Sequence, residues 1–170
     1  CTTDAHTKAR AETVGFSNAF YISNAAIVVA KDLNVKGLVD LQGKRLAVPD
    51  GSMVENRLRN EFAEKARNVN IVPVRSNWVG MNNLFEGKVD AFSNMHTMIS
   101  AELFRHPQAD KYEIVLANPY KEAYACLLPK GDTEFKKLVD DVLAGMMQSG
   151  EMETLYTKWF TLPIQPFGKS

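Results

Sequence analysis

Strand-like and helix-like segments alternate between residues 45 and 117, and this alternation constrains the fold more than any other feature. Four short apolar runs predict strands at 45–49, 70–74, 89–92 and 112–117. The segments between them have apolar residues at helical spacing, at 51–66, 78–87 and 97–104. Strands joined by single helices pair in parallel through right-handed crossovers, with helices on both faces. The pattern therefore predicts a doubly wound, mainly parallel α/β sheet.

The flanking segments extend this pattern. A β-branched run predicts a strand over 20–31, and apolar residues at helical spacing predict a short helix ended by Gly43. Beyond the alternating region, "EAYACLLPK" predicts a strand, Thr133 to Ser149 a long helix and "EMETLYTKWF" a last short one. The tail "TLPIQPFGKS" contains two prolines and is expected to be extended.

Composition restricts the classes of function. The 170 residues suffice for one domain or two small lobes, and 20 Lys and Arg balance 20 Asp and Glu. This balance argues against nucleic-acid binding, which usually needs a basic excess. The longest apolar run, "AAIVVA", falls far short of the roughly 18 residues that span a bilayer. No signal peptide is visible in the sequence.

Ligands of doubly wound sheets bind outside the carboxyl ends of the strands. This rule selects three segments: Asp50–Met53, Arg75–Trp78 and Ser93–His96. Ser52 and Glu55 have capping-box spacing, and the free N–H groups of a helix start also suit a carboxylate. The segment Ser93–His96 ends a buried strand with polar groups and no carboxylate.

Other chemistry has little basis in the sequence. The histidines show no metal-ligand spacing, and "VGFSNAF" is not a nucleophile elbow, so we predict no metal, cofactor or catalytic residue. Cys1 and Cys126 fit two buried thiols, a disulfide in an oxidising compartment, or a lipid-modified Cys1. Arg10 is either a solvated surface charge or, together with nearby threonine hydroxyls, part of an anion-binding site.

Several stretches together resemble one family: "ARAETVGFSNAFY", "DLQGKRLAVPDGSMVENRL", "LFEGKVDAF" and "EAYACLLPKGDTEFKKLVDDVLAGMMQSGEMETLYTKWF". In order and spacing they are similar to the periplasmic amino-acid-binding proteins of ABC importers (family 3), closest to the glutamate/aspartate-binding branch. The resemblance covers nearly all of the chain. It implies a periplasmic-binding-protein-like type II fold, in which two α/β lobes joined by crossing strands clamp a ligand.

On this resemblance, residues 1–31 are the end of lobe one and a first crossing segment, and residues 32–118 are lobe two. Residues 119–170 then form the return strand and the C-terminal helices of lobe one. One lobe is complete, and the opening part of the other is expected to be missing. An incomplete lobe leaves an exposed sheet edge, so a homodimer or swapped assembly is a further expectation.

The function implied is capture of a small carboxylate-bearing ligand, an amino acid or related organic acid, for transport by an ABC importer. The ligand-binding protein is expected in the periplasm, its partner is an inner-membrane permease, and no bond is broken, so it is not an enzyme. Two alternatives remain: a dehydratase-like enzyme acting on a small acid on the same scaffold, and the ligand-sensing domain of a receptor.

The resemblance also implies site residues. Arg10 matches the arginine that grips the ligand α-carboxylate, and Ser52 matches a turn that offers amides and a hydroxyl. Met95 stands where most of the family has the aspartate that binds the α-ammonium. Either another acid, Asp50 or Asp4, replaces it, or the ligand has no ammonium. The full expected set is Arg10, Thr3, Ser52, Met53, Asn77, Asn94, Met95 and His96.

Overall fold

The computed structural model describes residues 3–5, 8–115 and 121–159. The chain divides into two compact units: unit 1 comprises Cys1–Ser23 with Lys121–Ser170, and unit 2 comprises Asn24–Tyr120. The assignment of residues 1–31, 32–118 and 119–170 to lobes stays a prediction. The tail expected to be extended and the two residues Cys1 and Thr2 lie outside the described residues.

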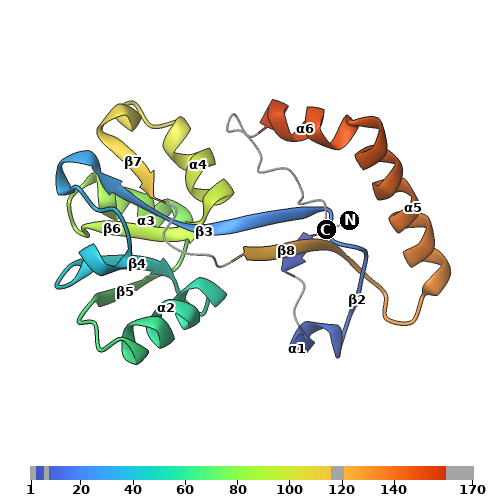
Figure 1. The fold of residues 1–170 in the computed structure, drawn as a ribbon, viewed down its shortest axis with the longest axis horizontal. Helices are drawn as coiled ribbons and strands as arrows, with labels where there is room; N and C mark the ends of the chain where they lie inside the picture. The colour runs from blue at the N-terminus through green and yellow to red at the C-terminus, as the bar shows by residue number, and fades with distance from the viewer. Residues whose placement is uncertain (1–2, 6–7, 116–120, 160–170) are drawn as a thin grey trace. The chain divides into compact units, whose positions relative to one another are not determined.

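Unit 2 is built on a mixed sheet of five strands in the order β7-β3-β6-β4-β5 (Figure 1). The parallel part is β4, β5 and β6, since β4 pairs in parallel with both of the others. β3 is antiparallel to β6 on one side and to β7 on the other. The strand bounds are β3 Tyr21–Ala30, β4 Arg45–Pro49, β5 Asn70–Val74, β6 Ala91–Met95 and β7 Tyr112–Val115.

The strand predicted over 112–117 is present as β7, but its parallel pairing was wrong. β7 runs in the same direction as β6, yet β3 lies between them and runs the opposite way. Strands joined by single helices pair in parallel only when they are neighbours in the sheet. The neighbour of β7 is β3, which precedes the alternating region of residues 45–117. β7 therefore has an antiparallel neighbour.

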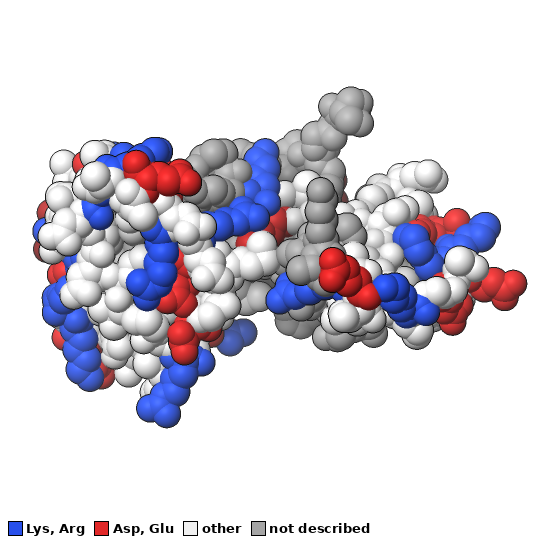
Figure 2. All heavy atoms as spheres, turned by 90° about the horizontal axis from the view of Figure 1, so that it is seen from below, with Lys and Arg blue, Asp and Glu red and all other residues white. Residues whose placement is uncertain are grey.

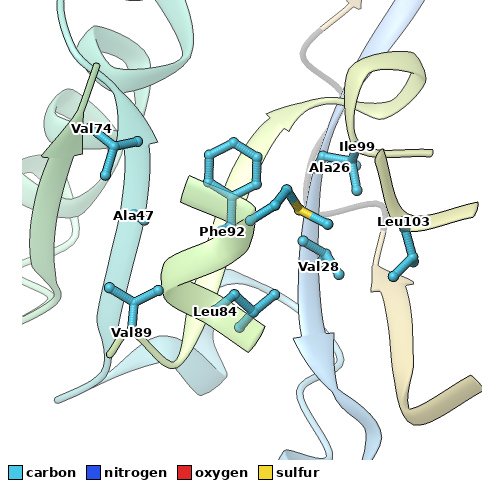
Figure 3. Close-up of a cluster of buried hydrophobic side chains, with 10 residues drawn as sticks. Ala26, Val28, Ala47, Val74, Leu84, Val89, Phe92, Ile99 and Leu103 are labelled. Carbon is cyan, nitrogen blue, oxygen red and sulfur yellow. The ribbon is translucent and has the colours of Figure 1, made fainter. Parts of the chain in front are cut away.

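Helices cover both faces of this sheet. α3 (Asn77–Phe85) and α4 (His96–Phe104) pack on one face, where a buried cluster joins Val28, Ala47 and Phe92 to side chains of both helices (Figure 3). α2 (Met53–Glu64) packs on β4 and β6. Side chains alternate along a strand, so Leu46 and Val48 face away from Ala47, toward α2. Short 3₁₀ turns complete the unit at Lys31–Leu33, Leu38–Leu41 and Ala109–Lys111.

Gly80, in the middle of α3, lies against the Phe92 side chain of β6. A Cβ added at Gly80 would collide with the Phe92 ring of β6. Phe92 is fully buried, enclosed by Val28, Ala47 and other cluster residues, so its ring has no room to move aside. Glycine at this position allows the backbone of α3 to lie directly against the central strand.

Unit 1 is built around β8 (Lys121–Leu128), which pairs antiparallel with β1 (Thr3–Ala5) and β2 (Gly15–Phe16). It also contains the short helix α1 (Lys8–Ala11) and the predicted helices α5 (Thr133–Ser149) and α6 (Glu151–Trp159). Asp140 of α5 accepts a hydrogen bond from the backbone of Asn18 at 2.6 Å.

Cys126 on β8 is disulfide-bonded. The pairing with Cys1 stays a prediction, because Cys1 lies outside the described residues.

Acidic and basic side chains are interspersed over the face shown in Figure 2. Within the described part of the chain, no helix is both long enough and apolar enough to cross a membrane.

We expect Gly80→Ala to lower the free energy of unfolding by about 1–3 kcal/mol, since the new methyl group overpacks a core that has no room for it. Gly145 in α5 is the matched control, because a Cβ there meets nothing within 4 Å. Gly145→Ala is expected to raise the free energy of unfolding by up to about 1 kcal/mol through helix propensity. Urea denaturation measures both. Equal effects from the two substitutions would contradict the close packing at Gly80.

Candidate functional site

The three parallel strands of unit 2 end at one edge of the sheet, and most of the predicted site residues lie there. Ser52 and Met53 follow β4, Asn77 follows β5, and Asn94, Met95 and His96 end β6 and begin α4. The Asp50 amide donates to the carbonyl of Val74 at 2.9 Å, which holds the ends of β4 and β5 together. We call this set of residues the carboxyl edge of unit 2.

At the start of α2, Ser52 caps the helix as predicted: its Oγ accepts from the Glu55 amide at 3.1 Å. The second half of the capping box differs, because the Glu55 carboxylate accepts from the Gly51 amide at 2.8 Å instead of the Ser52 amide. The Ser52 amide instead donates to the carbonyl of Pro49. Gly51 has a φ of +67°.

Two N–H groups at the start of α2 remain available. Those of Met53 and Val54 have no hydrogen-bond partner among the described residues. The first turn of a helix carries such unsatisfied donors, and the helix dipole adds positive potential there. The start of α2 can therefore bind an oxygen of an anionic group.

The Glu55 carboxylate, in the first turn of α2, is already bound. Arg59 donates to Glu55 from Nε at 2.9 Å and from Nη2 at 2.7 Å. These bonds, with help from the Gly51 amide, lower the pKa of Glu55 against the opposing effect of burial. Glu55 therefore serves the structure of the helix start and does not compete for a ligand.

A pair of asparagines joins the end of β6 to the start of α3. Asn94 Nδ2 donates to Asn77 Oδ1 at 2.6 Å, and Asn94 Oδ1 accepts from the Met95 amide at 2.8 Å. Asn94 is only 9% exposed, whereas Asn77 is half-buried. The Nδ2 group of Asn77 has no partner among the described residues, so it remains as a donor at the carboxyl edge.

Met95 and His96 complete the edge. Met95 is 3% exposed and pairs with Ala25 of β3, so its thioether is buried on the α2 side of the sheet. His96 is half-buried at the first position of α4, and burial lowers its pKa. Burial therefore favours the neutral form of its imidazole.

Arg10 and Thr3 belong to unit 1. Arg10 lies in α1 with an exposed side chain, and its carbonyl accepts from the amides of Thr13 and Val14. Thr3 lies in β1, where it pairs with Cys126. The placement of the Thr3 side chain is outside what the structure describes.

Some contacts of the carboxyl edge were not predicted from the sequence. Gly51 as the partner of Glu55 and Ser76 as the cap of α3 were missed, as was the bond between Asn77 and Asn94. Ser76 had a visible signal, since serine directly before a helix is a preferred cap. The asparagine pair had none, because it joins residues from two different strand ends.

The fold is that of a type II periplasmic-binding-protein-like α/β protein, with hydrogen-bond donors at the carboxyl edge of unit 2. The family described as bacterial extracellular solute-binding proteins, family 3, matches residues 1–162, and the chain belongs to this family. The resemblance noted in the sequence is thereby confirmed.

The curated relatives agree with this assignment. The glutamate/aspartate import solute-binding protein of Salmonella typhimurium is 31% identical over 157 residues, covering 92% of this chain and 52% of that protein. The L-glutamate/L-aspartate-binding protein of Pseudomonas aeruginosa is 29% identical over 168 residues, covering 99% of this chain and 56% of that protein. The chain thus spans about half the length of these relatives.

Solved structures confirm the fold class. An ancestral arginine-binding protein bound to glutamine has a TM-score of 0.76 at 28% identity, covering 93% of this chain and 68% of that one. The GluR0 ligand-binding core from Nostoc punctiforme, in complex with glutamate, shares the fold with a TM-score of 0.75 at 23% identity, covering 93% of this chain and 70% of that one.

Ser52→Ala is expected to lower the free energy of unfolding by about 1 kcal/mol, since it leaves the Glu55 amide without its cap. Ser76→Ala is the matched control: Ser76 Oγ accepts from the Val79 amide at 3.2 Å, so its loss should cost a similar amount. Thermal denaturation compares the two. No loss of stability in Ser52→Ala would contradict the cap.

His96 should make stability fall as the solution becomes acidic. Its folded pKa lies below the ordinary value of 6.5, so the unfolded state binds more protons between the two values. The free energy of unfolding therefore carries this contribution in full above about pH 6.5 and loses it as the pH falls toward the lowered pKa. We expect His96→Gln to flatten the stability curve between about pH 7 and 5, as measured by urea denaturation at several pH values. An unchanged slope would contradict the burial of the imidazole.

Proposed function

We propose that this chain belongs to the solute-binding component of an ABC importer and captures a small carboxylate-bearing ligand, an amino acid or a related organic acid. Membership of the family and the glutamate- and aspartate-binding relatives support this proposal. So does the carboxyl edge of unit 2, which lies where ligands bind in doubly wound sheets.

The observation that carries the proposal is the group of donors at this edge. The amides of Met53 and Val54 and the Nδ2 group of Asn77 all lack partners among the described residues. The carboxylate of Glu55, in the first turn of α2, is held by Arg59 and Gly51. A ligand carboxylate would bind where these donors are available.

Arg10 and Thr3 supply the contacts of unit 1 in this proposal. Arg10 is exposed, and an arginine guanidinium can form bidentate hydrogen bonds with a ligand carboxylate. Ser52, Met53, Asn77, Asn94, Met95 and His96 supply those of unit 2.

The proposed place of action is the periplasm, and the proposed partner is an inner-membrane ABC permease. The family is extracellular, and among the relatives is the histidine-binding periplasmic protein of Escherichia coli, 24% identical over 164 residues. Neither the family nor the relatives' names support the expected homodimer or swapped assembly, and it is not part of the proposal.

The two alternative functions are less well supported. Family members are solute-binding proteins, so a dehydratase-like enzyme would depart from every curated relative named above. A receptor domain finds support only in the fold shared with the GluR0 ligand-binding core. Assay of candidate acids for turnover distinguishes the enzyme, because a binding protein returns its ligand unchanged.

A panel of amino acids and organic acids tests the proposal by thermal shift and calorimetry. A ligand that binds the folded state should stabilise it by about 2.7 kcal/mol at about 100 times its Kd. We expect Arg10→Ala to weaken binding of that ligand by about tenfold or more, since a charge-assisted pair is lost.

Arg105→Ala is the matched control. Arg105 is exposed and follows the end of α4, whereas the carboxyl edge lies at the start of that helix. Its removal should leave ligand affinity unchanged. Stabilisation that survives Arg10→Ala would refute the carboxylate grip, and a full panel without any stabilisation would refute the proposed function.

A further inference from the structure

The hydrogen bond between Asn77 and Asn94 at the carboxyl edge determines which end of the Asn77 side chain, donor or acceptor, is left for a ligand. An asparagine side chain presents an acceptor oxygen on one side and a donor NH₂ group on the other. An isolated asparagine in a ligand site can turn over and serve either kind of ligand atom. Asn77 is not isolated, because its Oδ1 already accepts from Asn94.

The orientation of Asn94 is determined by the backbone. The Met95 amide donates to Asn94 Oδ1 at 2.8 Å, and a backbone amide is always a donor. Turning Asn94 over would place its NH₂ group against this N–H. Asn94 is 9% exposed, so water cannot readily compensate for the lost bond. Its Nδ2 therefore stays directed at Asn77.

The fixed orientation of Asn94 in turn fixes the orientation of the Asn77 side chain. Since Asn94 Nδ2 lies 2.6 Å from Asn77 Oδ1, the Nδ2 group of Asn77 is the part left for a ligand. It is a donor, like the unpartnered amides of Met53 and Val54 at the same edge. The orientations of Asn94 and Asn77 both follow from the Met95 amide, which can only donate.

We infer that Asn94 is a positioning residue that sets the polarity of the ligand site: through Asn77 it selects a ligand group that accepts hydrogen bonds, a carboxylate or carbonyl oxygen, over one that donates. This inference rests on the proposed function and names the chemistry that unit 2 selects. Ligands with an ammonium in the place of that carboxylate are disfavoured, because two donors would face each other.

Asn94→Asp tests the inference by reversing the polarity. The aspartate only accepts, so one oxygen keeps the Met95 amide and the other takes the NH₂ group of Asn77. Asn77 then presents Oδ1 to the ligand. Calorimetry compares glutarate with γ-aminobutyrate, and glutamate with 2,4-diaminobutyrate, as pairs in which a carboxylate is replaced by an ammonium. We expect the preference for the carboxylate member to fall by about tenfold to a hundredfold.

A new negative charge could produce the same change without any turn of Asn77, and the Asn77→Ala background separates the two causes. There, Asn94→Asp adds the charge but has no amide to turn. We expect the change in preference to be much smaller in this background. An equal change in both backgrounds would overturn the inference, and so would an unchanged preference in Asn94→Asp alone.

A measurement on the wild type requires no variant to fold well. The side-chain NH₂ resonances of Asn77, assigned by their loss in Asn77→Ala, should shift on addition of glutarate. Bound glutarate that leaves them in place would overturn the inference while leaving the proposed function intact. If no carboxylate ligand binds the wild type, the proposed function fails and the inference fails with it.

Discussion

The close contact between Gly80 and Phe92 positions the candidate site. It brings the backbone of α3 against β6, the strand that lies between β3 and β4 and is buried along its whole length. Asn77 lies one helical turn before Gly80, and Asn94 lies two residues after Phe92, on the same face of the strand. The steric contact in the core therefore places the two asparagines within hydrogen-bonding distance at the edge. A bulkier residue at position 80 would move α3 and with it the polar pair.

At the same edge, some polar groups bind one another and others remain as hydrogen-bond donors. Gly51, Ser52, Glu55 and Arg59 satisfy one another, so Glu55 and Arg59 are both used within unit 2. The amides of Met53 and Val54 and the Nδ2 group of Asn77 are neutral donors without a partner among the described residues. Such donors favour an anionic ligand without the desolvation cost of burying a free cation beside it. Arg10, the cation of the proposal, belongs to unit 1.

The predictable part of the structure was local. Apolar periodicity predicted β4, β5, β6 and the helices between them, and serine before a helix predicted the cap at Ser52. The parallel pairing of β7 was predicted wrongly, because the partner of a strand depends on which strand lies beside it. Periodicity along the chain carries no information about that. The reciprocal half of the capping box was also wrong, because Glu55 accepts from the Gly51 amide and the Ser52 amide donates to Pro49.

The sequence by itself determined the α/β class, the family and the three segments at which strands end, because these follow from local pattern and from the order of motifs along the chain. Only the tertiary structure decided which polar groups at those segments are used and which are free. Asn77 and Asn94 are 17 residues apart, and their bond exists because two strand ends and a helix start meet at one edge. The buried thioether of Met95 and the half-buried imidazole of His96 were decided in the same way, since burial belongs to the packed chain.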